Sequence, residues 1–83
     1  MKTMTIEVLA GRAGKSVESV RESLAVGWTT ELLALASGVS ANYVCKLIRR
    51  DSLEAKRMGR DWFISRSVGD GWLEARDVRV ELD

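Results

Sequence analysis

The 83-residue chain contains no histidine, no proline and a single cysteine, Cys45. Structural zinc sites need several cysteine and histidine ligands, and one thiol cannot form an internal disulfide. Because the chain has no histidine, the catalytic pairs of histidine with serine or cysteine are also excluded. We therefore expect a protein that is not an enzyme and that uses no metal or cofactor.

Long hydrophobic runs are also missing. No window approaches the roughly 18 consecutive apolar residues of a membrane-spanning helix, and the first residues, MKTMTIEV, lack the basic and apolar regions of a secretory signal. Apolar residues make up 46% of the chain and charged residues 30%, which is ordinary for a globular domain. We expect a cytoplasmic protein that does not contact a membrane.

The net charge of +1 is unevenly distributed along the chain. Residues 1–26 hold four basic and three acidic side chains, residues 27–66 hold seven and four, and residues 67–83 hold two and five. The three parts therefore carry +1, +3 and −3. A local basic excess suits a polyanion such as DNA, and a solvated basic face is the alternative.

The segment AGRAGKS, residues 10–16, has the GKS ending of a phosphate-binding loop. That loop needs four residues between its glycines, so that successive backbone N–H groups surround the phosphates. Only two residues separate Gly11 from Gly14. We instead predict that Gly14 is the turn between two short helices.

The same segment belongs to an internal repeat with an offset of 24 residues, which places 5–24 on 29–48. Each copy has a Thr suited to begin a helix, a Gly suited to end it in the left-handed conformation, and a Ser two residues later that can begin a second helix. The pattern predicts a helix-turn-helix in each copy. Identical pairs are Thr5/Thr29, Glu7/Glu31, Leu9/Leu33, Ala10/Ala34, Gly14/Gly38, Ser16/Ser40 and Val20/Val44.

The second helix of the second copy, SANYVCKLIRR (residues 40–50), has the side chains of a DNA-reading helix. Val44, Leu47 and Ile48 form an apolar stripe that we expect to face the core. On the other face, Asn can bond adenine, Lys can bond guanine, Ala can meet a thymine methyl group, and Arg can bind phosphates. The predicted DNA contacts are Ser40, Ala41, Asn42, Tyr43, Lys46, Arg49 and Arg50.

The corresponding helix of the first copy carries Glu18, Ser19 and Glu22 where the second copy has Asn42, Tyr43 and Lys46. Carboxylates would be repelled by phosphates. We predict that the first copy packs against the rest of the protein or contacts another protein. Its basic residues Arg12, Lys15 and Arg21 leave an auxiliary phosphate contact open.

A β-hairpin is predicted next, from EAKRM (54–58) and DWFIS (61–65) on either side of Gly59. We expect Asp51 to end the preceding helix in the left-handed conformation, and Met58, Trp62 and Ile64 to form the inner face of the hairpin. The predicted contacts with DNA backbone or minor groove are Lys56, Arg57, Gly59 and Arg60. A hairpin whose charged edges merely keep it soluble is the alternative.

The last part of the chain predicts a short closing helix and a strand. Ser67 is the expected N-cap of the helix, with Val68 and Trp72 one turn apart on its inner face. The alternation in VRVEL (78–82) places Val78, Val80 and Leu82 on one face of a strand.

Residues 28–76, WTTELLALASGVSANYVCKLIRRDSLEAKRMGRDWFISRSVGDGWLEAR, resemble the MerR-like winged helix-turn-helix domains of the excisionase family. The resemblance covers about six tenths of the chain. It implies major-groove contact by residues 40–50 and backbone or minor-groove contact around Arg57, Gly59 and Arg60. The chain departs from the family at Asp51, where glycine is usual, and at Glu54, near a customary proline.

These features predict a mainly α fold with a small β-hairpin wing, in one compact domain. A helical pair (1–26) precedes a winged helix-turn-helix (27–76) and an acidic strand or tail (77–83). The expected function is sequence-specific binding of double-stranded DNA, by an excisionase (a recombination directionality factor) or a transcriptional regulator of a mobile element, in the bacterial cytoplasm at the nucleoid. An integrase and cooperating copies of the chain are candidate partners. The alternative is a protein-interaction adaptor in which the helix-turn-helix is structural.

Overall fold

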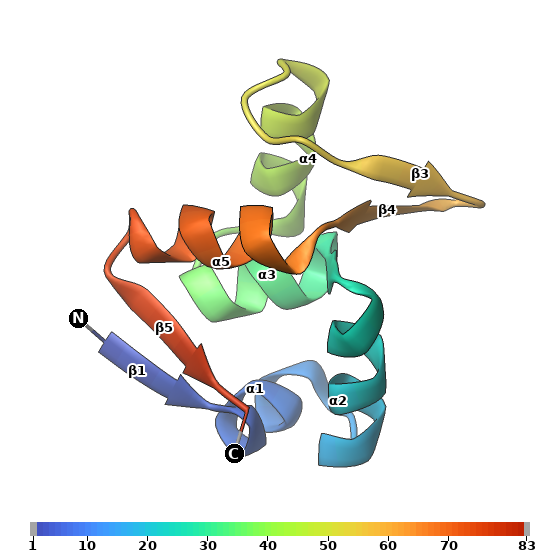
Figure 1. Cartoon of the computed structure of the whole chain (residues 1–83). Coiled ribbons are helices and arrows are strands. Elements are labelled where there is room, and N and C mark those ends of the chain that lie inside the picture. The colour runs from blue at the N-terminus through green and yellow to red at the C-terminus, as the bar shows by residue number, and fades with distance from the viewer. Residues whose placement is uncertain (1, 83) are drawn as a thin grey trace.

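Helices dominate the structure, a computed structural model that describes residues 2–82 (Figure 1). The mainly α fold with small sheets that the sequence predicts is confirmed. The helices are α1 (Ile6–Ala13), α2 (Val17–Val26), α3 (Thr30–Ser37), α4 (Ala41–Arg49) and α5 (Arg66–Glu74). The strands are β1 (Lys2–Thr5), β2 (Trp28–Thr29), β3 (Lys56–Met58), β4 (Asp61–Ile64) and β5 (Val78–Glu81).

The internal repeat forms two helix pairs with matching N-caps. Thr5 Oγ1 accepts a hydrogen bond from Val8 N at 3.3 Å, and Thr29 Oγ1 accepts one from Leu32 N at 3.1 Å. Ser16 and Ser40 cap α2 and α4 in the same way, each accepting at 3.1 Å from the N–H three residues later. Each cap satisfies one of the backbone donors that a helix leaves unpaired at its start.

Gly14 and Gly38 end the first helix of each pair in the left-handed conformation, with φ of 66° and 79°. Beyond them, Lys15 N donates to Ala10 O at 3.0 Å, and the equivalent Val39 N donates to Ala34 O at 3.1 Å. These bonds close the helix ends in the manner of a Schellman motif. AGRAGKS therefore forms the end of α1 and the connection to α2, and Gly14 is the turn between the two helices, as predicted.

The second pair turns sharply, since α3 and α4 are bent by 116° at their connection. No single helix among residues 2–82 is long and apolar enough to cross a membrane; by length and composition alone, the bent pair of α3 and α4 passes that test. In the structure α3 lies in the core, where Leu32, Leu33 and Ala36 are buried.

Strands β3 and β4 form the predicted hairpin, with Gly59 at its tip at φ 65°. The short strand β2 extends it to three strands in the order β2-β4-β3. Ile64 is buried as expected, but the prediction that Met58 belongs to the inner face is wrong, because its side chain is 54% exposed. Met58 lies near the tip, where the hairpin extends beyond the body of the protein (Figure 1).

The predicted strand at the end of the chain pairs with an unpredicted one at its beginning. β5 runs parallel to β1, with Lys2 opposite Val78 and Thr5 opposite Glu81. The first and last strands of the described chain thus lie side by side, below α3 and α5 in Figure 1. Val78 joins the core, while Val80 and Leu82 are half-buried.

Helix α5 begins two residues earlier than predicted. Its N-cap is Ser65, whose Oγ accepts from Val68 N at 3.3 Å, and the prediction of Ser67 as the cap is wrong. The chain leaves β4 at Ile64, so Ser65 already has the extended backbone that an N-cap requires, whereas Ser67 lies within the first turn of the helix.

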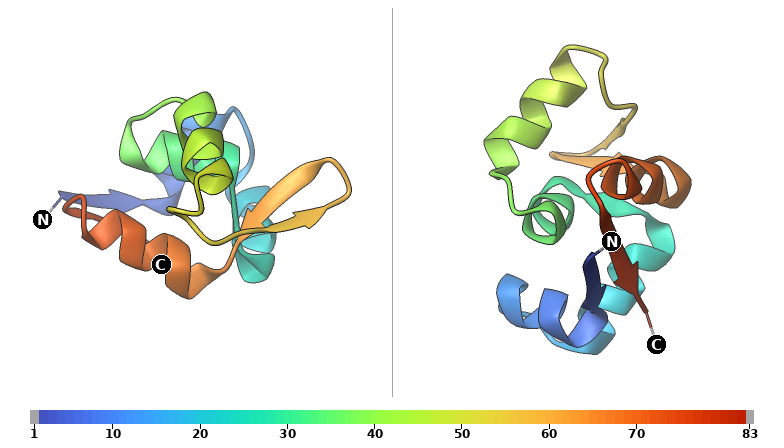
Figure 2. Two further views of the ribbon diagram at one scale, coloured as in Figure 1. Left: turned by 90° about the horizontal axis from the view of Figure 1, so that it is seen from above. Right: turned by 90° about the vertical axis from the view of Figure 1, so that its left-hand side faces the viewer.

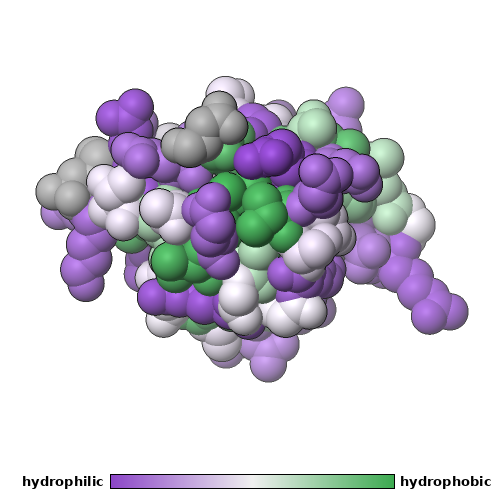
Figure 3. Space-filling model, turned by 90° about the horizontal axis from the view of Figure 1, so that it is seen from below, coloured by the Kyte–Doolittle hydropathy of each residue, from purple (hydrophilic) through white to green (hydrophobic). Residues whose placement is uncertain are grey.

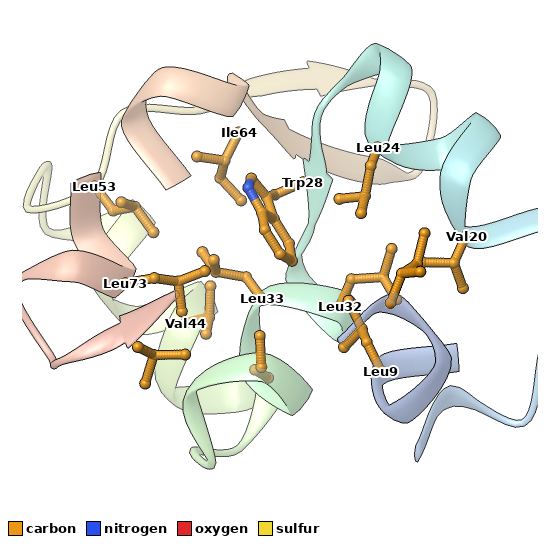
Figure 4. Packing of buried hydrophobic residues seen from close by; sticks show 14 of the residues in the cluster. Leu9, Val20, Leu24, Trp28, Leu32, Leu33, Val44, Leu53, Ile64 and Leu73 are labelled. Carbon is orange, nitrogen blue, oxygen red and sulfur yellow. The ribbon is translucent and has the colours of Figure 1, made fainter. Parts of the chain in front are cut away.

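Trp28 is the largest fully buried side chain and lies among residues from several elements (Figure 4). In this view Ile64 and Leu24 lie on either side of the indole, and Leu33 of α3 lies near it. Trp28 Nε1 donates to Asp70 Oδ1 at 2.9 Å, which satisfies the buried polar atom. Arg66 forms an ion pair with the same carboxylate at 3.2 Å. Trp28 therefore connects the first helix pair, the hairpin and α5.

Gly69 faces the Trp28 indole so closely that a Cβ at this position would overlap the ring. We predict that Gly69→Ala lowers the free energy of unfolding by about 1–3 kcal/mol, because the rigid, buried indole has no room to move. Gly71→Ala is the matched control in the same helix, since a Cβ there meets nothing within 4 Å. It should raise the stability by about 0.5–1 kcal/mol. Urea unfolding of the two variants measures both effects, and equal stabilities would contradict this packing.

Candidate nucleic-acid interface

Helix α4 has one buried face and one exposed face, as its sequence predicts. Val44 and Ile48 are buried, and Leu47 and Cys45 are half-buried. All of the predicted DNA contacts on α4 are exposed, including the two residues that cap its ends. They are Ser40, Ala41, Asn42, Tyr43, Lys46, Arg49 and Arg50. The apolar stripe thus fixes which side chains α4 presents to solvent.

The N-terminal end of α4 begins at Ser40, whose hydroxyl caps the helix through Tyr43 N. Asn42 lies in the first turn and Lys46 one turn later, so they occupy the same side of the exposed face. No protein hydrogen bond is recorded within residues 2–82 for either side chain. Both polar groups are therefore available to another molecule.

Tyr43 is exposed but has a partner that the sequence did not indicate. The Arg76 guanidinium lies 6.0 Å from the Tyr43 ring centroid and 4.8 Å from that of Trp72. Both distances are within the range of cation–π attraction. The end of α5 therefore flanks α4 and adds a cation beside its exposed face.

The C-terminal end of α4 carries Arg49 and Arg50 and is closed by Asp51. Asp51 has the predicted left-handed backbone, with φ of 58°. Asp51 N donates to Ile48 O at 3.1 Å, and the following Ser52 N donates to Leu47 O at 2.9 Å. The chain then returns to the core at Leu53 and continues into the hairpin. This turn sets the direction in which the hairpin leaves α4.

The predicted hairpin contacts Lys56, Arg57, Gly59 and Arg60 are all exposed. Arg57 is held on the hairpin, with its guanidinium 5.4 Å from the Trp62 ring centroid and its Nε donating to Gly59 O at 3.5 Å. Arg60 lies at the tip beside Gly59. In Figure 1 the hairpin projects to one side of the molecule, on the same half as α4 and away from α1 and α2.

This half of the molecule is basic. Residues 40–61 contain six exposed cations, Lys46, Arg49, Arg50, Lys56, Arg57 and Arg60, and three carboxylates, Asp51, Glu54 and Asp61, which gives +6 − 3 = +3. None of the ion pairs recorded within residues 2–82 joins these groups. The basic excess is therefore free to act on a polyanion in solution.

The first helix pair has a different exposed face. Glu18, Ser19 and Glu22 of α2 are exposed at the positions that correspond to Asn42, Tyr43 and Lys46 of α4. Figure 1 shows α1 and α2 in the half of the molecule away from α4. The two pairs share caps and turns, and the difference between them lies in their outward side chains.

Comparison with protein-family models, curated proteins and solved structures finds no match for this chain. No group of three or more His, Cys, Asp or Glu side chains suitable for a metal ion occurs within residues 2–82.

The turn at Asp51 gives a direct test of how α4 is connected to the hairpin. Because alanine tolerates a positive φ less well than aspartate does, Asp51→Ala should lower the free energy of unfolding by about 1 kcal/mol. Asp51→Gly should leave stability unchanged or raise it, since glycine adopts this conformation without strain and no hydrogen bond of the Asp51 side chain is recorded among residues 2–82. Chemical unfolding compares the two variants. A larger loss for glycine than for alanine would contradict the left-handed turn.

Proposed function

We propose that the protein is a sequence-specific DNA-binding protein, in which α3 and α4 form a helix-turn-helix and β3 and β4 form its wing. The observation that carries the proposal is the exposed face of α4, where Asn42 and Lys46 stand on a helix fixed by its buried Val44 and Ile48. The bend of 116° between α3 and α4 is in the range of helix-turn-helix units.

In this proposal α4 is the recognition helix and enters the major groove by its Ser40 end. The Asn42 amide has the donor and acceptor needed for the edge of adenine, and the Lys46 ammonium can donate to the guanine acceptors. Ala41 is small enough to approach a thymine methyl group. Arg49 and Arg50, at the far end of the helix, supply phosphate contacts that position it without reading sequence.

The hairpin contributes a second contact to the same duplex. Lys56, Arg57 and Arg60 offer three cations to the backbone or the minor groove. The stacking of Arg57 on Trp62 limits its freedom, so less conformational entropy is lost when it binds a phosphate. Arg60 at the tip has no comparable ring contact among residues 2–82.

The resemblance of residues 28–76 to excisionases supports a role as a recombination directionality factor, or as a transcriptional regulator, of a mobile element. The protein would act at the bacterial nucleoid, binding adjacent sites cooperatively and bending them for an integrase. Bending a 20–30 bp site costs roughly 1–6 kcal/mol, so one 83-residue domain benefits from a bound neighbour.

A second candidate function is a protein-interaction adaptor in which the helix-turn-helix is structural. Figure 3 favours it: hydrophobic side chains gather near the middle of the face seen from below, which is the side of α1, α2, β1 and β5. The two functions are compatible, with DNA on the α4 half and a protein partner on the opposite one. The salt dependence of binding distinguishes the two functions. Affinity that rests on phosphate contacts falls steeply as salt is added, whereas affinity through an apolar interface changes little.

Selection from a random duplex pool tests the proposed recognition helix. We expect the wild-type protein to enrich a repeated site, and Asn42→Ala and Lys46→Ala to lower the affinity for it by about 1–3 kcal/mol each while relaxing the preference at one position. Glu18→Ala and Glu22→Ala, at the matching positions of α2, are the controls and should leave the enriched sequence unchanged.

The arrangement of enriched sites also separates the two biological roles. Head-to-tail repeats support an excisionase array, and inverted repeats support a two-fold regulator. Absence of binding even at low salt would remove the DNA-binding proposal and leave the adaptor.

A further inference from the structure

A basic groove lies on the flank of the molecule, beside the turn that leads into α4. Lys2 of β1, Arg12 of α1 and Arg76 at the end of α5 line it, and Gly38 of the α3–α4 turn forms part of its wall. Asp77 is the one carboxylate among its lining residues. The right panel of Figure 2 looks onto this side, where α1, β1 and the ends of α3 and α5 come together. The rest of its lining is uncharged and includes the apolar residues Met4, Val8, Ala36 and Val78. Residues far apart in the sequence thus form one groove that carries three cations.

Two of these cations are held in place by other parts of the protein. Arg12 Nη1 donates to Leu35 O at 3.1 Å, one of the carbonyls left unpaired near the end of α3, and its other N–H groups have no partner within residues 2–82. Arg76 is positioned by Trp72 and reaches Tyr43 of α4. Arg76 therefore joins the groove to the exposed face of the helix.

The groove has a net positive charge, because three cations face one carboxylate. No ion pair recorded within residues 2–82 involves Lys2, Arg12 or Arg76. Like charges brought together without a neutralising partner destabilise a fold modestly, and a bound anion would relieve that repulsion. The chemistry fits phosphate, which arginine binds through its planar set of donors.

We propose that this groove binds the phosphodiester backbone of the same duplex that α4 contacts, an inference that rests on the proposed function. The major groove is only about 12 Å wide, so the strands that border it pass close beside a helix lying in it. In Figure 1 the hairpin extends from one side of α4, and the ends of α3 and α5 lie on the other. Gly38 and Arg76, which follow those ends, line the groove. The recognition helix is therefore flanked by a basic contact on each side.

The proposal gives the first helix pair a role in DNA binding. Although the outward face of α2 is acidic, α1 contributes Arg12 on the side next to α3, and β1 contributes Lys2. The N-terminal unit then acts as a backbone clamp that holds the register of α4 and makes no base contact.

The slope of log affinity against log salt tests this contact. The double variant Arg12→Gln/Arg76→Gln should reduce the magnitude of the slope by about 1–2, since each phosphate contact contributes roughly 0.9. It should preserve the enriched sequence. The control is Arg79→Gln, which removes a cation outside the groove and should leave the slope within about 0.5 of the wild type.

Arg76→Lys separates charge from packing, because it keeps the cation and removes the planar stack on Trp72. We expect its slope to match that of the wild type even if its melting temperature falls. A slope for Arg12→Gln/Arg76→Gln equal to that of Arg79→Gln would overturn the groove as a DNA contact while leaving α4 and the hairpin as the binding surface. Absence of DNA binding by the wild type would overturn the proposed function, and this site with it.

Discussion

The packing of Trp28 against Gly69 and its hydrogen bond to Asp70 are the constraint on which the rest of the structure depends. Trp28 follows α2, begins the strand that pairs with Ile64 of the hairpin, and immediately precedes the cap of α3. Its indole packs against α5 at Gly69, where a residue with a side chain would overlap the ring. One buried ring thus fixes the first helix pair, the hairpin and the closing helix relative to α3, and α3 in turn supports α4.

The repeated helix pair shows how one folding unit serves two purposes. Caps at Thr and Ser and a left-handed glycine determine that each pair forms, and these features are the same in both copies. What each pair contacts is decided by outward positions that do not affect folding. In α4 they hold an amide and cations, and in α2 they hold carboxylates, so the proposed function follows from a few exposed side chains on a shared scaffold.

Local signals in the sequence predicted most of the secondary structure. The caps of the two repeated helix pairs, Gly14, Gly38, the turn at Asp51 and the hairpin around Gly59 all depend on residues close together in the chain, and each forms as predicted. The β1–β5 pairing and the Trp28–Asp70 bond join distant segments, so no local pattern indicates them. The same holds for Arg76, which reaches α4 only because α5 folds back beside it. The spacing of apolar residues in α4 predicts which of its side chains are exposed. It does not predict that Lys2, Arg12 and Arg76 come together beside the helix.

The proposed DNA-binding surface is the half of the molecule that carries α4 and the hairpin. Backbone amide chemical shifts of the wild-type protein, measured by NMR as a short duplex is added at low salt, test it most directly. We expect the largest changes within residues 40–50 and 56–60, with smaller ones around Gly38 and Arg76, and we expect them to reverse when the salt concentration is raised. Changes confined to α2 and the outer face of the β1–β5 sheet, or no changes at all, would contradict it.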